Sequence, residues 1–180
     1  MHNEPWQVYS NNGASLSGHS ADKGEINKNP SLIVGASHVW IWRENNGTTE
    51  LLLQKRSASV KSWPGYYDIS TAGHIDANES PIETAVREAE EEVGLGINAD
   101  DLYFVFSLRA SIRDTEFDWV YLYKLTNDAQ FRFEDGEVES LEWVTLEEFQ
   151  ERISDTSKNK IVPHGDPYFA LLLMNLRRII

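Results

Sequence analysis

Apolar residues follow two different spacings along the chain, and the two spacings separate the predicted strands from the predicted helices. Alternating or short continuous apolar runs predict strands. These runs occupy residues 4–10, 31–43, 50–56, 68–72, 102–112, 116–125, 130–134 and 137–144. Apolar residues three and four positions apart predict helices after Ser80, after Thr145 and from Asp166 onward. Because helices interrupt and follow a series of strands, the order predicts a sheet covered on both faces.

Glycine, proline and asparagine mark the connections between these elements. Asn46-Gly47 lies between two apolar runs and predicts a tight hairpin. Further turns are expected at residues 113–115 and at Asp135-Gly136. Pro64-Gly65 interrupts any regular element within residues 57–67, so this segment is expected to be a loop.

The N-terminal part of the chain differs from the rest in composition. Residues 11–30 are rich in Asn, Gly, Ser and Lys, with only scattered apolar residues. Residues 1–30 are therefore expected to form an irregular arm packed on the domain. Residues 31–180, which include the C-terminal helix, are expected to form that single domain, since a chain of 180 residues suits one core.

The helix expected after Ser80 has clear signals at both ends. Ser80 can cap it, Pro81 suits its first position, and Glu83 can complete a capping box by accepting a hydrogen bond from the backbone of the cap. Gly94 is expected to end it, because glycine readily takes the left-handed conformation. Thr145 predicts a second capped helix in the same way.

Three carboxylates of the first helix, Glu88, Glu91 and Glu92, fall within an arc of roughly 100° opposite its apolar stripe. Like charges at these spacings oppose helix formation by about 0.2–0.5 kcal/mol per pair. The cluster has two interpretations. It is a solvated acidic face, or it supplies oxygen ligands to a hard divalent cation, Mg²⁺ or Mn²⁺.

From Gly73 the chain reads GHIDANESPIETAVREAEEEVGL, which resembles the Nudix box, the signature of the Nudix hydrolase superfamily. The matching positions are Gly73, Glu79, Arg87, Glu88, Ala89, Glu91, Glu92, Gly94 and Leu95. Seven fixed letters agree by chance on the order of 10⁻⁸ per starting position, which favours the metal interpretation. The resemblance implies that Arg87 orients the carboxylates and that Glu79 braces the loop before the helix. Asn78 stands where glycine is common, and asparagine tolerates a left-handed turn.

The resemblance also implies a fold and an activity. The fold is an α/β/α sandwich around a mixed sheet. The activity is that of a pyrophosphohydrolase, which uses a metal to hydrolyse a diphosphate joined to another group. Glu88, Glu91, Glu92 and the carbonyl of Gly73 are implied to hold Mg²⁺ or Mn²⁺, and Glu116 completes the expected catalytic set.

A hydrolase also needs a general base and groups that bind the phosphates. The resemblance leaves the base open among Glu88, Glu116, Asp118 and Glu137. Arg56 and Lys61 lie in and beside the loop that precedes Gly73. Taken alone these cations are equally consistent with a solvated basic edge, but beside a metal site they are expected to bind diphosphate oxygens.

A longer resemblance indicates one branch of the superfamily. The segments QKRSASVKSWPGYYDISTAGH and EFDWVYLY are similar to isopentenyl-diphosphate isomerases and their hydrolase relatives. The isomerases carry a cysteine just before the Gly-His pair, whereas Ala72 occupies that position here. Glu116 and Asp118 match the acidic pair, and His19 is a possible ligand from the arm. A hydrolase is expected, because a methyl group cannot transfer a proton. The alternatives are an isomerase-like activity and a non-catalytic domain that binds a diphosphate ligand.

The amino-acid composition limits the kinds of molecule that the chain is expected to bind. A net charge of -13 argues against bulk electrostatic binding to nucleic acid or anionic membranes, so a small-molecule diphosphate is the expected partner. The chain has no cysteine, which suits a reducing cytoplasm, the expected location. The opening MHNEPWQ is not typical of a signal peptide, and the apolar run 168–174 is too short to span a bilayer. That run is expected to pack on the domain or to form a homodimer.

Overall fold

The long strand β3 (Ile33–Asn45) is the centre of the sheet in the computed structural model, which describes residues 4–29, 31–110, 115–133 and 136–180. Its first ten residues are all buried, as a continuous apolar run predicts for a strand covered on both faces. One edge of β3 pairs in parallel with β8 (Glu116–Lys124). The other edge pairs antiparallel with β1 (Trp6–Tyr9), β6 (Thr71–His74) and β4 (Thr48–Arg56). The sheet is therefore mixed, as predicted.

Shorter strands extend the sheet on both sides of β3. They are β2 (Ser15–Ala21) on β1, β7 (Leu102–Arg109) on β8, and β5 (Tyr67–Asp68) and β9 (Val138–Thr145) on β4. The hairpin between β3 and β4 is confirmed, because Asn46 and Gly47 have φ values of 51° and 78°, as this tight turn requires.

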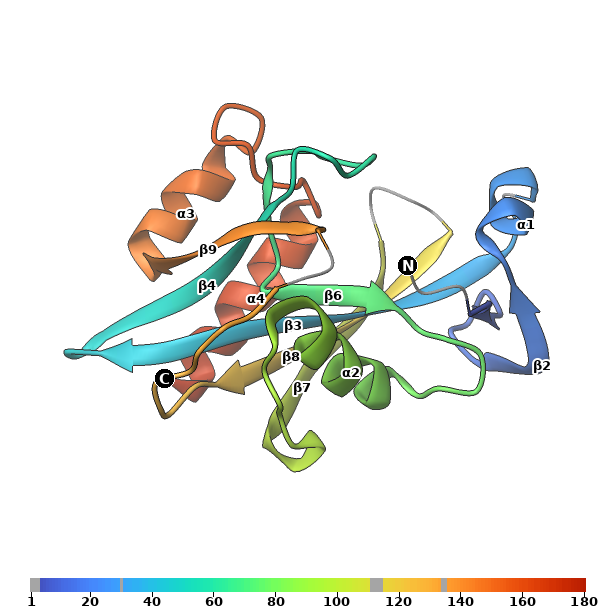
Figure 1. Cartoon of the computed structure of the whole chain (residues 1–180), viewed down its shortest axis with the longest axis horizontal. Coiled ribbons are helices and arrows are strands. Elements are labelled where there is room, and N and C mark those ends of the chain that lie inside the picture. The colour runs from blue at the N-terminus through green and yellow to red at the C-terminus, as the bar shows by residue number, and fades with distance from the viewer. Residues whose placement is uncertain (1–3, 30, 111–114, 134–135) are drawn as a thin grey trace.

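Helices cover both faces of the sheet, as Figure 1 shows. They are α2 (Pro81–Val93) on one face, and α3 (Leu146–Ser154) and α4 (Asp166–Ile179) on the other. Val39 and Ile41 of β3 point to the first face, where they pack in one core with the apolar stripe of α2. Trp40 and Trp42 point to the second face and join a core with α3 and α4. The predicted α/β/α sandwich is confirmed.

The ends of α2 follow the sequence signals. Ser80 accepts a hydrogen bond from the backbone of Glu83 at 3.4 Å, and the Glu83 carboxylate accepts one from the backbone of Ser80 at 2.8 Å. Gly94 ends the helix at φ 66°, in the left-handed region. The capping box that Thr145 predicts is also present at the start of α3.

The N-terminal part is more regular than predicted. The irregular arm expected over residues 11–30 is wrong as to its local structure, because β2 and a short helix, α1 (Lys23–Lys28), lie within it. Six of the seven β2 residues are exposed, so no apolar pattern marks this strand. Asp22 and Glu25 form a capping box for α1 that the prediction missed. Residues 4–10 do contain the predicted strand, β1, which lies between β2 and β3.

Two further predictions need correction. The strand expected over 68–72 is divided, because Ser70 interrupts it: its hydroxyl donates to the backbone of Leu52 at 2.6 Å and accepts from Ile41 at 2.8 Å. Residues 130–133 form no strand, and Glu134 lies outside the described residues. The turn positions 113, 114 and 135 and the predicted strand end at 111–112 lie outside them as well.

A short 3-10 helix, η1 (Ala99–Asp101), precedes β7. No helix in the described ranges is long and apolar enough to cross a membrane.

Candidate active site

Gly73 in β6 lies directly against the acidic side of α2. A Cβ atom placed on Gly73 would lie 1.9 Å from Oε1 and 2.0 Å from the carboxyl carbon of Glu88. No other side chain than hydrogen fits between the strand and this carboxylate. The glycine that opens the sequence motif is therefore required by close approach, since its φ is not among the positive values.

Arg87 binds four of the surrounding oxygen groups. Its Nε and Nη2 donate to the Glu79 carboxylate at 3.0 and 2.9 Å. Its Nη1 donates to Glu88 at 2.6 Å and to Glu91 at 3.3 Å. Nη2 also donates to the carbonyl of His74 at 3.3 Å, which ties the helix to the end of β6. This guanidinium supplies the positive charge that lets the carboxylates lie close together.

The three clustered carboxylates differ in environment. Glu92 is buried, and its Oε2 accepts hydrogen bonds from the backbone of Ala72 at 2.9 Å and from Gln54 at 3.2 Å. Burial and then the neighbouring Glu88 raise the pKa of Glu92 to about 8. Burial also raises the pKa of Glu88, against the opposing effect of Arg87. The side chain of Glu91 is 47% exposed, so it is the most accessible of the three.

The carboxylate oxygens of Glu88, Glu91 and Glu92 suit a hard divalent cation as metal ligands. Each side chain that could bind the metal offers carboxylate oxygens, the ligands that Mg²⁺ and Mn²⁺ prefer. Glu92 is buried and Glu88 is partly buried, and both have raised pKa values, so their charged forms need a positive partner. As the side chains stand, no three Asp, Glu or His residues of the described chain converge on one point, and Nη1 of Arg87 lies between Glu88 and Glu91. The cluster fits a divalent metal ion in the chemistry and charge of its oxygens, whereas the side chains as they stand hold Arg87 between two of the carboxylates.

A cavity of about 160 Å³ opens on the face of the sheet opposite α2. Its walls come from β3, β6 and β8 and from the segments around Asp68 and His164. Ala72 and His74 contribute from β6, and Gly73 lies between them. Because Gly73 lines this cavity and also touches Glu88, one residue joins the cavity to the carboxylates of α2.

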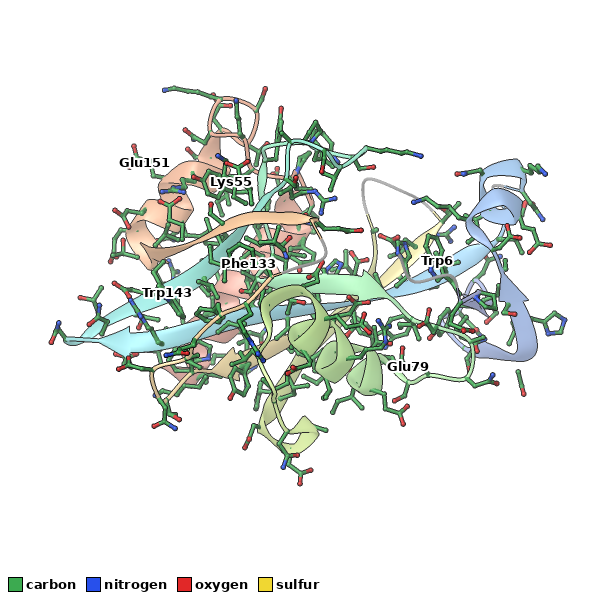
Figure 2. All side chains as sticks on the ribbon, in the orientation of Figure 1. Trp6, Lys55, Glu79, Phe133, Trp143 and Glu151 are labelled. Carbon is green, nitrogen blue, oxygen red and sulfur yellow. The ribbon has the colours of Figure 1, made fainter. Side chains whose placement is uncertain are left out.

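Two carboxylates of β8 line the cavity. Oε2 of Glu116 lies 3.0 Å from Nε2 of His74, whose ring stacks on Trp6 at a centroid distance of 3.6 Å (Trp6 is labelled in Figure 2). Asp118 is 2% exposed, and its Oδ1 has no hydrogen-bond partner among the described residues. Burial and then the charge of Glu116 raise the pKa of Asp118 to about 7.

Two histidines in the cavity wall have pKa values shifted in opposite directions. Burial lowers the pKa of His38 to about 3, and its Nδ1 lies 3.0 Å from the hydroxyl of Tyr168. Burial alone would lower the pKa of His164 as well. Asp68, 2.7 Å from its Nε2, instead raises the pKa of His164 above the usual value. Asp68 also accepts a hydrogen bond from Arg56 at 3.3 Å. One wall thus holds the neutral imidazole of His38 and a second imidazole, that of His164, whose protonation Asp68 favours.

The sequence-predicted residues occupy different parts of this region. Arg56 lines the cavity, and its Nε donates to the backbone of Ser62 at 3.0 Å. Lys61 is exposed and is not among the lining residues. Glu137 is exposed just before β9, and His19 is exposed in β2.

Asp68 and His164 were not singled out by sequence reasoning. They lie 96 positions apart, and neither belongs to a motif with a fixed spacing. Only the folded chain joins them. A histidine in the polar segment that precedes the last helix is the sole sequence signal, and it is a weak one.

A three-layer sandwich with a carboxylate-rich helix beside a glycine and a cavity is the arrangement that the resemblance to a Nudix domain implies. The model of the NUDIX domain matches residues 33–165, and the chain belongs to the Nudix family. It is 35% identical over 164 residues to Nudix hydrolase 3 of Arabidopsis thaliana, covering 86% of this chain and 21% of that protein. The chain thus spans about a fifth of that relative's length.

Other comparisons support the branch and the fold. An isopentenyl-diphosphate Delta-isomerase of Corynebacterium diphtheriae is 30% identical over 133 residues, which cover 69% of this chain and 70% of the isomerase. The crystal structure of DR0079 from Deinococcus radiodurans superposes with a TM-score of 0.65 at 23% identity, over 84% of this chain and 89% of that one. The predicted resemblance to the isomerase-like branch is confirmed. The relative in Arabidopsis thaliana that is named a Nudix hydrolase belongs to the same family.

Proposed function

We propose that the chain is a divalent-metal-dependent hydrolase of a diphosphate linked to a second chemical group. The observation that carries this proposal is the contact between Gly73 and Glu88, which joins the carboxylate cluster of α2 to the cavity. A substrate with phosphates at the cluster and its other group in the cavity uses both parts. A solvated acidic face would need neither the close approach nor the buried position of Glu92.

Each residue of the site has a role in this proposal. Glu88, Glu91, Glu92 and the carbonyl of Gly73 hold Mg²⁺ or Mn²⁺, which when bound neutralises phosphate charge and activates water. Arg87 keeps the carboxylates in place, and Glu79, whose Oε2 also accepts from Thr84 at 2.6 Å, anchors Arg87. Glu79 lies at the turn before α2 (Figure 2).

Substrate binding and proton transfer fall to residues around the cavity. Arg56 lines it and offers its guanidinium to phosphate oxygens, and we assign Lys61 a supporting contact from the same loop. Glu116 is our candidate for the general base, since its carboxylate lines the cavity and contacts His74. The partner is a small-molecule diphosphate, in keeping with the acidic net charge of -13. A cytoplasmic location remains a prediction, and so does a homodimer.

The experiment compares Glu91→Gln with Glu90→Gln. Both changes remove one charge from adjacent positions of α2, but Glu90 contacts Arg132 at 4.0 Å and lies outside the cluster. We expect Glu91→Gln to lower turnover by at least ~10² on a panel of diphosphates with Mg²⁺ or Mn²⁺, and Glu90→Gln to leave it nearly unchanged. Equal turnover in the two variants would remove Glu91 from the proposed metal shell. We also expect Mn²⁺ to raise the melting temperature of the native chain but not that of Glu91→Gln/Glu92→Gln.

The isomerase relative supports a second candidate, which Ala72 argues against. Ala72 lines the cavity at the position where the isomerases carry cysteine, and its methyl group cannot move a proton. Metal-dependent release of phosphate or a monophosphate from the panel supports the hydrolase. Binding without turnover of any member supports a non-catalytic domain.

A further inference from the structure

Asp118 carries a buried oxygen with no hydrogen-bond partner. Its side chain is 3% exposed, and Oδ1 accepts no hydrogen bond from the described residues. Nε2 of His38 lies 3.9 Å from this oxygen, which is beyond hydrogen-bond reach. A buried carboxylate oxygen without a partner is costly, so native proteins seldom keep one without a use for it.

This oxygen belongs to a residue of the cavity wall. Asp118 lies beside Ala36 in the β3–β8 register, and both line the cavity on the face opposite α2. Much of the remaining wall is apolar, with Ile69 and Ala110 among its members. A volume of about 160 Å³ resembles that of engineered cavities of about 150 Å³ that hold one benzene ring. The space therefore suits a compact group of about that size.

The charges around Asp118 indicate which kind of functional group the ligand places in the cavity. Glu116 on the same strand adds a second carboxylate, while Arg56 and His164 both bind Asp68. His38 is neutral, because burial keeps its pKa at about 3. Asp68 thus offsets Arg56 and His164 where they contact it, and with the carboxylates of Glu116 and Asp118 the wall near Asp118 favours hydrogen-bond donors over anions.

We propose that Asp118 accepts a hydrogen bond from a hydroxyl or amino group on the compact, non-phosphate part of the substrate. The proposal rests on the proposed function, because it assumes that the phosphates lie near Gly73 and Arg56, which line the same cavity. A site built to accept a hydrogen bond rejects an analogue that lacks the donor, since the buried acceptor is then left unpaired. Asp118 is in this sense a specificity residue.

The test uses methylene-bridged, non-hydrolysable analogues of 4-hydroxybutyl, 4-aminobutyl and pentyl diphosphate, which are similar in size and differ at one terminal group. We measure their Kd values for the full chain with Mn²⁺ by isothermal titration calorimetry. The native chain is expected to bind the hydroxyl and amino analogues about tenfold or more tighter than the pentyl analogue. Equal affinity for all three overturns the proposal.

Two variants assign the preference to Asp118. Asp118→Leu is expected to reduce the hydroxyl-to-pentyl preference to about one, while its retained binding of the pentyl analogue shows that it folds. Asp118→Asn keeps an acceptor oxygen but no charge, so it is expected to lose affinity for the amino analogue more than for the hydroxyl analogue. An unchanged hydroxyl-to-pentyl preference in Asp118→Leu overturns the proposal, and so does an unchanged ratio of amino to hydroxyl affinity in Asp118→Asn, which alone decides it if Asp118→Leu does not fold.

Hydrolysis is measured separately, on 4-hydroxybutyl diphosphate and pentyl diphosphate. A binding preference without hydrolysis of either compound contradicts the hydrolase proposal and leaves the role of Asp118 standing. Hydrolysis of both compounds without a binding preference contradicts the role of Asp118 alone.

Discussion

Replacing Gly73 with Ala tests the contact on which the site depends. The added methyl group would lie within 2.6 Å of three atoms of Glu88, so that side chain must turn away. Glu88 is not free to turn without cost, because Nη1 of Arg87 binds its Oε1 at 2.6 Å. The backbone is compatible with alanine, since Gly73 does not have a positive φ. The effect is therefore steric and specific to Glu88.

The size of the effect follows from two opposing contributions. Losing a hydrogen bond between charged groups costs roughly 1.5–3 kcal/mol, whereas Gly→Ala in a compatible conformation stabilises by about 0.4–1 kcal/mol. The free energy of unfolding should fall by about 0.5–2.5 kcal/mol, at about 2–4 °C of melting temperature per kcal/mol for a chain of this size. In a Glu88→Ala background the methyl group meets no carboxylate. There we expect Gly73→Ala to be neutral or stabilising.

The assay is urea unfolding followed by tryptophan fluorescence, in EDTA so that metal binding does not contribute. The four chains of the cycle are native, Gly73→Ala, Glu88→Ala and the double variant. The reasoning is refuted if Gly73→Ala costs the same with and without the Glu88 carboxylate. A Mn²⁺ titration of Gly73→Ala provides a second measurement, in which we expect weaker binding because Glu88 is displaced.

Three further predictions address the substrate, the chemistry and the pH dependence. Arg56→Ala and Lys61→Ala should each raise KM or lower kcat/KM without weakening Mn²⁺ binding in the absence of substrate, and unchanged kinetics in both would return the pair to a solvated basic edge. Isopentenyl diphosphate with Mg²⁺ or Mn²⁺ should give no dimethylallyl diphosphate, because Ala72 replaces the cysteine; its formation at enzymatic rates would overturn this expectation. The pKa of Asp118 is about 7 in the folded state and 3.8 ordinarily. Between these two pH values the folded state binds more protons than the unfolded state. The free energy of unfolding therefore falls over that range as pH rises. The melting temperature of Asp118→Asn relative to native should therefore be higher at pH 8 than at pH 4, and an equal difference at both would contradict the raised pKa.

Local sequence signals predicted the elements whose ends and periodicity are encoded nearby. Ser80 and Gly94 bound α2, and Asn46-Gly47 forms the hairpin, because capping and turn chemistry depend on a few adjacent residues. The strand β2 was missed for the opposite reason. It is held by pairing with β1 along exposed, polar residues, so no apolar alternation marks it.

The two halves of the candidate site were not equally predictable. The carboxylate cluster lies within one helix, so its spacing was visible in the sequence. The cavity is assembled from β3, β6, β8 and the segment before α4. Two contacts of this cavity join distant parts of the chain. One is the hydrogen bond between His164 and Asp68, and the other is the stacking of Trp6 on His74. Such contacts depend on the sheet register, which local patterns do not specify.

The position of β3 also has a consequence for the order in which the chain folds during synthesis. β1, β3, β4, β6 and α2 all leave the ribosome before β8, which completes the second edge of β3. Until then the most buried strand of the protein presents an open edge of apolar residues, a form prone to pairing with other chains. Parallel pairing over such a separation is also slow to form. Nascent or truncated chains that stop before Lys124 are thus the forms most in need of chaperones.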